Sequence, residues 1–246
     1  MLILVFDTST KNGTVGWVKT DDTADSMRVV DWAHTYMPAI PGHAERLLER
    51  IDFCLKSGGF TTKDVNLIVI GRGPGTFTGL RIGFSTAKAL SLAHQIPLVT
   101  VSTLEMLARN AAAGGTVAAL LDARRKEVYM GVYRVDGSTV PATVTALMPE
   151  CVISPDGVAT ALAEHHIDGP VQLVGDGAVA YADKLAGLGA GAAMNTVGFD
   201  TYQAALCGVQ TFQTDGPCDT ALAEPLYLRE PDAKKPKSPF GSAASN

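Results

Sequence analysis

Two short stretches of the sequence carry residue types that could hold a phosphate group. The first is Asp7, which directly follows an apolar run and is itself followed by three hydroxyl residues, Thr8, Ser9 and Thr10. On a hairpin bend, a carboxylate beside hydroxyls can orient Mg²⁺ and phosphates, or it can simply cap the turn. The residue types leave both interpretations open.

The second stretch is a loop with glycines at 71, 73, 75 and 79, placed between an apolar run and a helical pattern. Glycine lets backbone amides approach a ligand or another part of the chain closely. Amides at a helix N-terminus can hold phosphate, so nucleotide binding is physically available here. The spacing fits neither the P-loop nor the dinucleotide pattern, and the alternative is a tight connection that only packs the helix on the sheet.

Metal and nucleophilic catalysis have little support in the residue spacing. The five histidines include no pair four residues apart, the commonest arrangement for two ligands on one helix face. A G-x-S-x-G elbow is absent, and no cysteine has an obvious histidine partner. The four cysteines form no C-x-x-C pair, which favours buried thiols that pack in a reducing compartment.

Composition indicates a globular protein of the cytoplasm. Hydrophobic residues make up 46% of the chain and charged residues 18%. No apolar run approaches the roughly 20 residues of a membrane span, and the first residues do not resemble a signal peptide. The net charge of −5 argues against a large phosphate-binding surface, so any contact with nucleic acid is expected to be indirect. The basic groups at 124–126 and 234–237 are interpreted as solvated surface.

The first half of the chain predicts a mixed sheet covered by helices. Residues 1–7 and 13–19 predict a β-hairpin with its bend at Asp7, followed by a third strand around 27–33. Apolar residues at helical spacing predict a helix over about 43–57, which a glycine pair ends. A strand at 65–70 then enters the glycine-rich loop. A second helix to His94 and a strand at 96–101 complete this half.

A second hairpin is predicted to begin at Asp122, so the two halves look like weak duplicates. Laying Asp7 on Asp122 places Gly16 on Gly131 and Val15 on Met130. The candidate phosphate or nucleotide contacts are therefore Asp7, Thr8, Ser9, Gly73, Gly75, Thr76, Thr78, Gly79 and Asp122.

The rest of the second half predicts fewer regular elements. A helix is expected over 104–112 and a short strand at 171–174, with irregular surface over 135–170. A linker is predicted at 187–198 and a helix at 202–212.

Several motifs together resemble the TsaB family, once called YeaZ. The most specific is Gly-Arg-Gly-Pro-Gly-Thr-Phe-Thr-Gly-Leu-Arg-Ile-Gly at 71–83. Agreement continues with the opening Ile-Leu-Val-Phe-Asp-Thr-Ser-Thr at 3–10 and Val-Ser-Thr-Leu at 101–104. It includes the run Glu-Pro-Leu-Tyr-Leu-Arg at 224–229. The resemblance covers about residues 1–230.

The resemblance implies an α/β protein with the actin-like ATPase (ASKHA, ribonuclease H-like) fold, made of two related α/β domains of which the second is reduced. The expected domains are 1–101 plus 200–230, and 102–199. Residues 231–246 are expected to form a disordered tail.

The function implied by the resemblance is that of a non-catalytic subunit of the complex that transfers threonylcarbamoyl to N6 of adenosine 37 in tRNAs reading codons that start with A. Its expected partners are TsaD, the catalytic subunit, TsaE, an ATPase, and a second copy of itself when alone. The isolated chain is expected to need no cofactor or metal, although ATP or ADP with Mg²⁺ can act within the complex. The helices at 43–57 and 79–94 are the expected interface, with apolar contact candidates Leu48, Phe53, Phe84 and Leu90.

The chain departs from nucleotide-binding relatives at Gly175-Asp176-Gly177-Ala178, where a carboxylate stands at the second position of their Gly-Gly-x-Ser/Ala loop. This departure puts adenine binding in doubt. The main alternative function is an independent small-metabolite kinase of the same fold. It would use Asp7 for magnesium, the loop Gly73–Gly79 for phosphates and Asp122 as base. A metallopeptidase is a weaker alternative.

Overall fold

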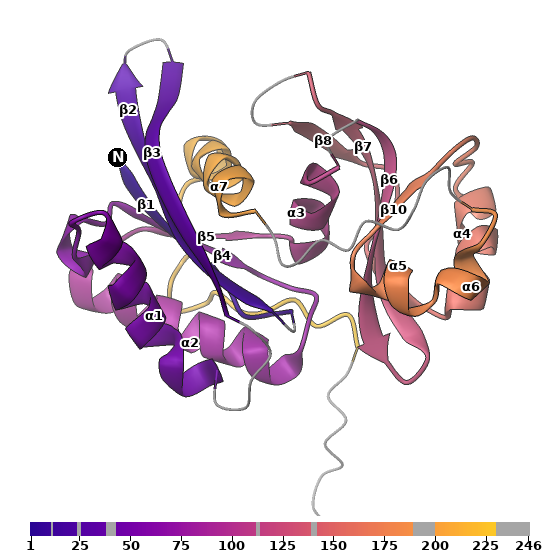
Figure 1. Ribbon diagram of the computed structural model, residues 1–246, viewed down its shortest axis with the longest axis horizontal. Helices are drawn as coiled ribbons and strands as arrows, with labels where there is room; N and C mark the ends of the chain where they lie inside the picture. The colour runs from indigo at the N-terminus through magenta and orange to yellow at the C-terminus, as the bar shows by residue number, and fades with distance from the viewer. Residues whose placement is uncertain are drawn as a thin grey trace, which may run out of the picture.

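The computed structural model describes residues 1–10, 12–23, 26–37, 43–111, 114–138, 142–188 and 200–229. It contains two mixed β-sheets side by side, each with helices packed against it (Figure 1).

The first sheet has the strand order β3 (Ser26–Met37), β2 (Gly13–Thr23), β1 (Leu2–Asp7), β4 (Leu67–Gly71), β5 (Leu98–Val101). β1 and β2 form the predicted antiparallel hairpin, whereas β4 and β5 run parallel to β1. Parallel strands buried on both faces read as continuous apolar runs, as β1 and β4 do.

Helices cover both faces of this sheet. α1 (His43–Ser57) and α2 (Phe77–His94) pack on one face, and α7 (Thr201–Asp215) packs on the other (Figure 1). The alternation of side chains along β1 divides its residues between these layers. Leu4 and Phe6 share a core with α1 and α2, while Ile3 and Val5 share a second core with α7. The sheet is therefore the buried middle layer of this half.

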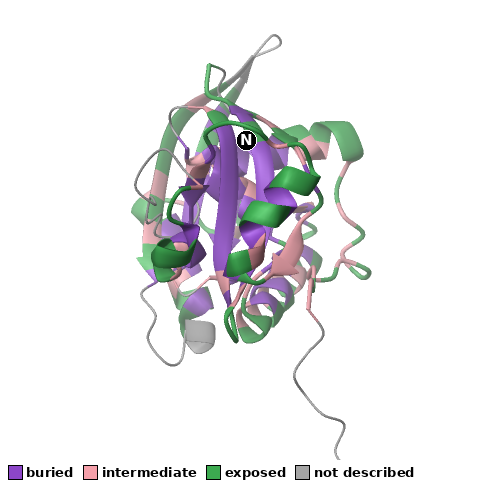
Figure 2. Ribbon diagram, turned by 90° about the vertical axis from the view of Figure 1, so that its right-hand side faces the viewer, coloured by how far each residue is buried: buried purple, intermediate pink, exposed green. Residues whose placement is uncertain are grey.

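The second sheet has the order β10 (Gln172–Val174), β6 (Gly115–Arg124), β7 (Glu127–Asp136), β8 (Thr143–Ala146), and β9 (Cys151–Ile153) also pairs with β7. Its outer face carries α4 (Val158–Glu164), α5 (Asp176–Ala180) and α6 (Ala182–Leu185). Short 3₁₀ turns lie at Thr62–Asp64 and Pro155–Gly157. Figure 2, which faces this side of the molecule, shows buried strands behind more exposed helices.

The two sheets repeat one arrangement. In each, an antiparallel hairpin continues into a parallel strand, β1–β2 with β4 and β6–β7 with β10. Among the described residues, no strand of the second sheet corresponds to β5 of the first. This is the predicted actin-like, ribonuclease H-like α/β fold with a reduced second half.

The predicted alignment of the two hairpins is wrong by one residue. Asp7 pairs with Thr14, leaving six residues between them, whereas Asp122 pairs with Val128, leaving five. The second bend is shorter, so the residue that occupies the pairing position of Gly16 is Met130 rather than Gly131.

Residues 135–170 are also more regular than predicted, because they contain β8, β9 and α4. The predicted helix at 104–112 is the shorter α3 (Thr103–Arg109). Most of the expected linker and all of the expected tail lie outside the described residues. The domain boundaries stay a prediction.

α3 connects the two halves. Its Met106 lies in the core that α7 forms with the first sheet, and its Leu104 and Leu107 lie in the core on the inner face of the second sheet. One seven-residue helix thus contributes to both halves.

β3 is the edge strand of the first sheet and carries an irregularity. The pairing with β2 shifts so that Val30 is left as an extra residue, and the Asp31 carboxylate accepts a hydrogen bond from the Trp32 amide at 2.8 Å. The rings of Trp32, His34 and Tyr36 follow one another along the exposed side of this strand.

Candidate functional site

The bend of the first hairpin is closed by hydrogen bonds within the chain. Asp7 is 1% exposed, and its carboxylate accepts from the Ser9 amide at 3.1 Å and from the Thr10 hydroxyl at 3.4 Å. Burial raises the pKa of Asp7, although these hydrogen bonds oppose the shift. Asp7 therefore serves as the buried cap of the turn in this conformation, which is one of the two uses that its sequence context allowed.

The glycine-rich loop packs directly on this bend. The Thr76 amide donates to the Ser9 carbonyl at 2.6 Å, and the Thr8 hydroxyl donates to the Gly79 carbonyl at 2.7 Å. A Cβ at Gly79 would lie 1.8 Å from the Thr8 carbonyl oxygen, and a Cβ at Gly75 would lie 2.4 Å from that of Ser9. The glycines thus allow close contact between two parts of the chain.

The remaining residues predicted in this loop occupy different environments. Gly73 has a φ of +103°, which favours glycine, and a Cβ there would meet the Leu226 carbonyl oxygen at 2.9 Å. Thr76 and Thr78 are exposed at the start of α2. The structure therefore brings Asp7, Thr8, Ser9, Gly75 and Gly79 together, with Thr76 and Thr78 on the outer side.

A C-terminal strap, defined here as residues 216–229, runs from the first half to the second (Figure 1). Its Leu226 amide donates to the Arg72 carbonyl at 2.8 Å, beside the glycine loop. Its Arg229 guanidinium donates to the Ala123 carbonyl at 2.8 Å and to the Glu127 carboxylate at 3.0 Å, in the second hairpin. The strap thus joins the glycine loop to the second bend.

The second bend is held in a similar way to the first. The Asp122 amide donates to the Asp176 carboxylate at 2.9 Å, and the Asp122 carboxylate accepts from the Arg124 amide at 2.9 Å. Gly175 has a φ of +98°, and a Cβ there would lie 2.2 Å from the Leu120 carbonyl oxygen. The carboxylate of Asp176, which stands at the position where the chain departs from the nucleotide-binding pattern, therefore accepts a hydrogen bond from the backbone of β6 in its own sheet.

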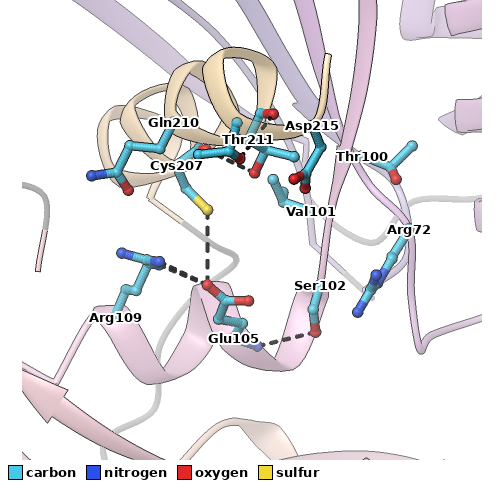
Figure 3. A pocket seen from close by; sticks show the side chains of 11 residues that line it. Arg72, Thr100, Val101, Ser102, Glu105, Arg109, Cys207, Gln210, Thr211 and Asp215 are labelled. Atoms are coloured by element: carbon cyan, nitrogen blue, oxygen red, sulfur yellow. Dashed lines mark hydrogen bonds and ion pairs between the residues drawn. The ribbon is translucent and has the colours of Figure 1, made fainter. Parts of the chain in front are cut away.

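A cavity of about 270 Å³ lies apart from both bends. It opens beyond the ends of β4 and β5 and lies between α3 and the last turns of α7 (Figure 3). Glu105 and Arg109 form an ion pair at 2.7 Å along α3, and the Cys207 thiol donates to the same Glu105 carboxylate at 3.8 Å. Burial and the nearby Glu105 raise the pKa of Cys207 to about 11.

Sequence reasoning missed this cavity. Its lining comes from positions near 72, 102, 109 and 211, which are far apart in the chain. The sequence signal that could have pointed to it is the polar end of the helix predicted at 202–212, which continues to Asp215 without a basic residue in its last turn.

The helix surface contains two of the four predicted interface residues. Leu48 and Phe53 on α1 are 57% and 63% exposed. Leu90 is half-buried against the core below α2. Phe84 is 4% exposed and lies within that core. Phe84 is therefore a core residue and is not available to a partner, because its side of α2 faces the sheet.

Within the part of the chain that the structure describes, no group of three or more His, Cys, Asp or Glu residues could hold a metal ion. In the same residues, no helix has both the length and the apolar character to cross a membrane. The four cysteines are free thiols; Cys54 and Cys207 are buried as predicted, whereas Cys151 and Cys218 are only half-buried.

Comparisons with known proteins agree on one family. A family model described as TsaD, tRNA N6-adenosine threonylcarbamoyltransferase, matches residues 38–205. The tRNA threonylcarbamoyladenosine biosynthesis protein TsaB of Escherichia coli K12 is 39% identical over 116 residues, which is 45% of this chain and 50% of that protein. The Bacillus subtilis protein of the same name is 35% identical over 136 residues, or 54% of this chain and 56% of its own length. The chain thus aligns with only about half the length of these relatives.

Among solved structures, YeaZ from Pseudomonas aeruginosa superposes with a TM-score of 0.75 at 26% identity. This match covers 92% of the present chain and 99% of the other. On the family model, the curated relatives and this structure, the chain belongs to the TsaD-like family and, within it, to the TsaB (YeaZ) proteins.

Proposed function

We propose that this protein is a non-catalytic subunit of the system that makes threonylcarbamoyladenosine on tRNA, and that it binds and activates the catalytic subunit TsaD. The relatives named for this pathway support its place there. Under this proposal TsaE is a further partner, and a second copy is the partner of the chain when it is alone. Contact with tRNA is indirect, any ATP or ADP with Mg²⁺ acts in the assembled complex, and the protein is cytoplasmic.

The observation that carries the non-catalytic role is the closure of both hairpin bends by the chain itself. These bends held the residues that a kinase of this fold would use. Asp7 is buried and accepts hydrogen bonds from Ser9 and Thr10. The space beside Gly75 and Gly79, which a phosphate would need, is occupied by the carbonyl groups of Ser9 and Thr8. An amide that already donates to an internal carbonyl must break that bond before it can bind a ligand. The Asp7 carboxylate is 1% exposed and must be uncovered before its remaining lone pairs can reach one.

The exposed face of α1 is the proposed contact with TsaD. Leu48 and Phe53 are large apolar side chains that protrude beside charged, exposed residues such as Asp52 and Lys56, which pair with each other at 2.7 Å. An apolar anchor surrounded by a polar rim is the usual composition of a protein interface. Polar neighbours also keep such a surface soluble before the partner binds.

The proposal is tested by reconstituting tRNA modification with the synthase, TsaD, TsaE, ATP, threonine and bicarbonate, with and without this protein. We expect product only when the chain is added, and no ATP hydrolysis by the chain alone. Equal product without it contradicts the proposal. ATP turnover by the isolated chain on a small metabolite favours the kinase alternative.

The interface is tested by Phe53→Asp and Leu48→Asp. A charge in the centre of an apolar contact is expected to weaken TsaD binding by about tenfold or more, measured by isothermal titration calorimetry. Both positions are exposed, so the fold should remain, which circular dichroism checks. Val179→Asp is the matched control, since Val179 is 45% exposed but lies on α5. Equal loss in the control, or no loss at α1, would place the interface elsewhere.

A further inference from the structure

The cavity between α3 and α7 lies where open α/β sheets commonly bind ligands. It is located beyond the carboxyl ends of the parallel strands β4 and β5. Arg72 and Ser102, which directly follow these strands, line it. Its volume of about 270 Å³ is just below the roughly 300–1,000 Å³ of pockets for drug-sized ligands. The space therefore suits a metabolite smaller than a nucleotide.

Much of the hydrogen-bonding capacity in the wall can only accept. The Thr211 hydroxyl donates its proton to the Cys207 carbonyl at 3.0 Å, and the Thr214 hydroxyl donates to the Thr211 carbonyl at 3.3 Å. Ser102 is buried and offers a ligand little, because its hydroxyl donates to the Glu150 carboxylate and accepts from the Glu105 amide at 3.2 Å. A hydroxyl whose proton is committed keeps only lone pairs for a ligand. The α7 wall therefore favours a ligand that donates several hydrogen bonds.

The charges around the cavity are separated by sign. Asp215 ends α7, whose last turn contains no basic residue, so the carboxylate and the negative end of the helix dipole reinforce each other. Arg72 follows β4 on another side of the cavity, and its guanidinium makes no ion pair with a described residue (Figure 3). Deeper in the wall, Glu105 and Arg109 neutralise each other.

We propose that this cavity binds a small α-amino acid as its zwitterion. The ammonium group donates to Asp215 and the hydroxyl oxygens at the end of α7, and the carboxylate accepts from Arg72. A short polar side chain faces the remaining hydroxyls. The site does not depend on the proposed role in tRNA modification, and it requires neither bend.

The test is isothermal titration calorimetry of the isolated full-length chain with L-serine, L-threonine and L-glutamine. Propionate and n-butylamine serve as probes that keep only the acid or only the amine. We expect the amino acids to bind at least about tenfold more tightly than either single-charge probe, because each probe lacks one of the two charged groups that form hydrogen bonds with the site. Binding of propionate as tight as that of serine, or no heat with any amino acid, would overturn the proposal.

Two variants separate the charged ends. Asp215→Asn and Arg72→Gln are each expected to weaken amino-acid binding about tenfold, while Asp215→Asn leaves the weak binding of propionate unchanged. Both side chains are exposed, so folding is not at risk. Arg81→Gln on α2 is the matched control and should bind as the native chain does. Unchanged affinity in Asp215→Asn rules out recognition of the ammonium group at this wall.

Discussion

Single residues determine whether the first bend can open. Asp7 is the clearest case, because its carboxyl is buried and its pKa is raised above the ordinary value of 3.8. A buried carboxyl prefers its neutral form, and its ionisation at higher pH works against burial more than the hydrogen bonds from Ser9 and Thr10 compensate.

Asp7→Asn is expected to change the pH dependence of stability. With a raised folded-state pKa, the contribution of Asp7 is complete below about pH 3.8 and is lost as the pH rises through its folded-state pKa. In that window the native protein should lose roughly 1.4 kcal/mol of unfolding free energy per pH unit from this group. Asparagine does not titrate, so the difference between the two proteins in urea denaturation should follow this slope. Parallel pH profiles would show that Asp7 ionises freely in the fold.

At the scale of elements, the strap holds the glycine loop and the second hairpin together. Ala123 lies where the pairing of β6 and β7 shifts between Asp122 and Arg124, so its carbonyl turns to the Arg229 guanidinium. The Ala123 carbonyl is thus satisfied by a charged donor, and this hydrogen bond helps to hold the end of the strap against the second hairpin.

Arg229→Ala is expected to loosen the strap and cost about 1 kcal/mol of stability, a modest value because Arg229 and Glu127 are partly exposed. The amide of Leu226, which bonds to the Arg72 carbonyl, should exchange its hydrogen faster. Arg229→Lys keeps one charged donor and should recover part of the protection. Unchanged exchange at Leu226 in the alanine variant would mean that the strap is fixed by Leu226 and its neighbours alone.

How far the sequence predicts these elements depends on where their partners lie. The hairpin at Asp7 and the strand before the glycine loop follow from local apolar patterns and turn residues, and both were predicted closely. β8 is a mostly exposed strand of four residues and β9 a half-buried strand of three, and both are too short for a clear alternation of side chains. Their pairing with β7, rather than their own sequence, holds them in place. Phe84 was misassigned because helical spacing does not tell which side faces the sheet, and the cavity was missed because tertiary packing assembles it.

At the scale of the whole molecule, α3 couples the two halves. Met106 packs with the first sheet, while Leu104 and Leu107 pack with the second. One half cannot unfold without exposing part of this helix, so the burial that stabilises each half depends on the other.

We therefore expect the chain to unfold in one cooperative transition. Its two tryptophans, Trp17 and Trp32, both lie in the first sheet, so their fluorescence reports on that half alone. Far-UV circular dichroism reports on both halves. Coincident guanidinium midpoints from the two signals are the expected result. Separate midpoints would show that the halves fold independently and that α3 does not couple them.

The irregular edge strand β3 bears on how the protein behaves when it is concentrated. A long, regular edge offers unpaired amides and carbonyls to a neighbouring molecule and can seed aggregation. Here the extra residue Val30 interrupts the regular edge, and the Asp31 carboxylate already occupies the Trp32 amide beside it. The edge that bears the exposed aromatic rings of β3 therefore resists the addition of a strand from another molecule. This resistance favours solubility even though the rings expose apolar surface.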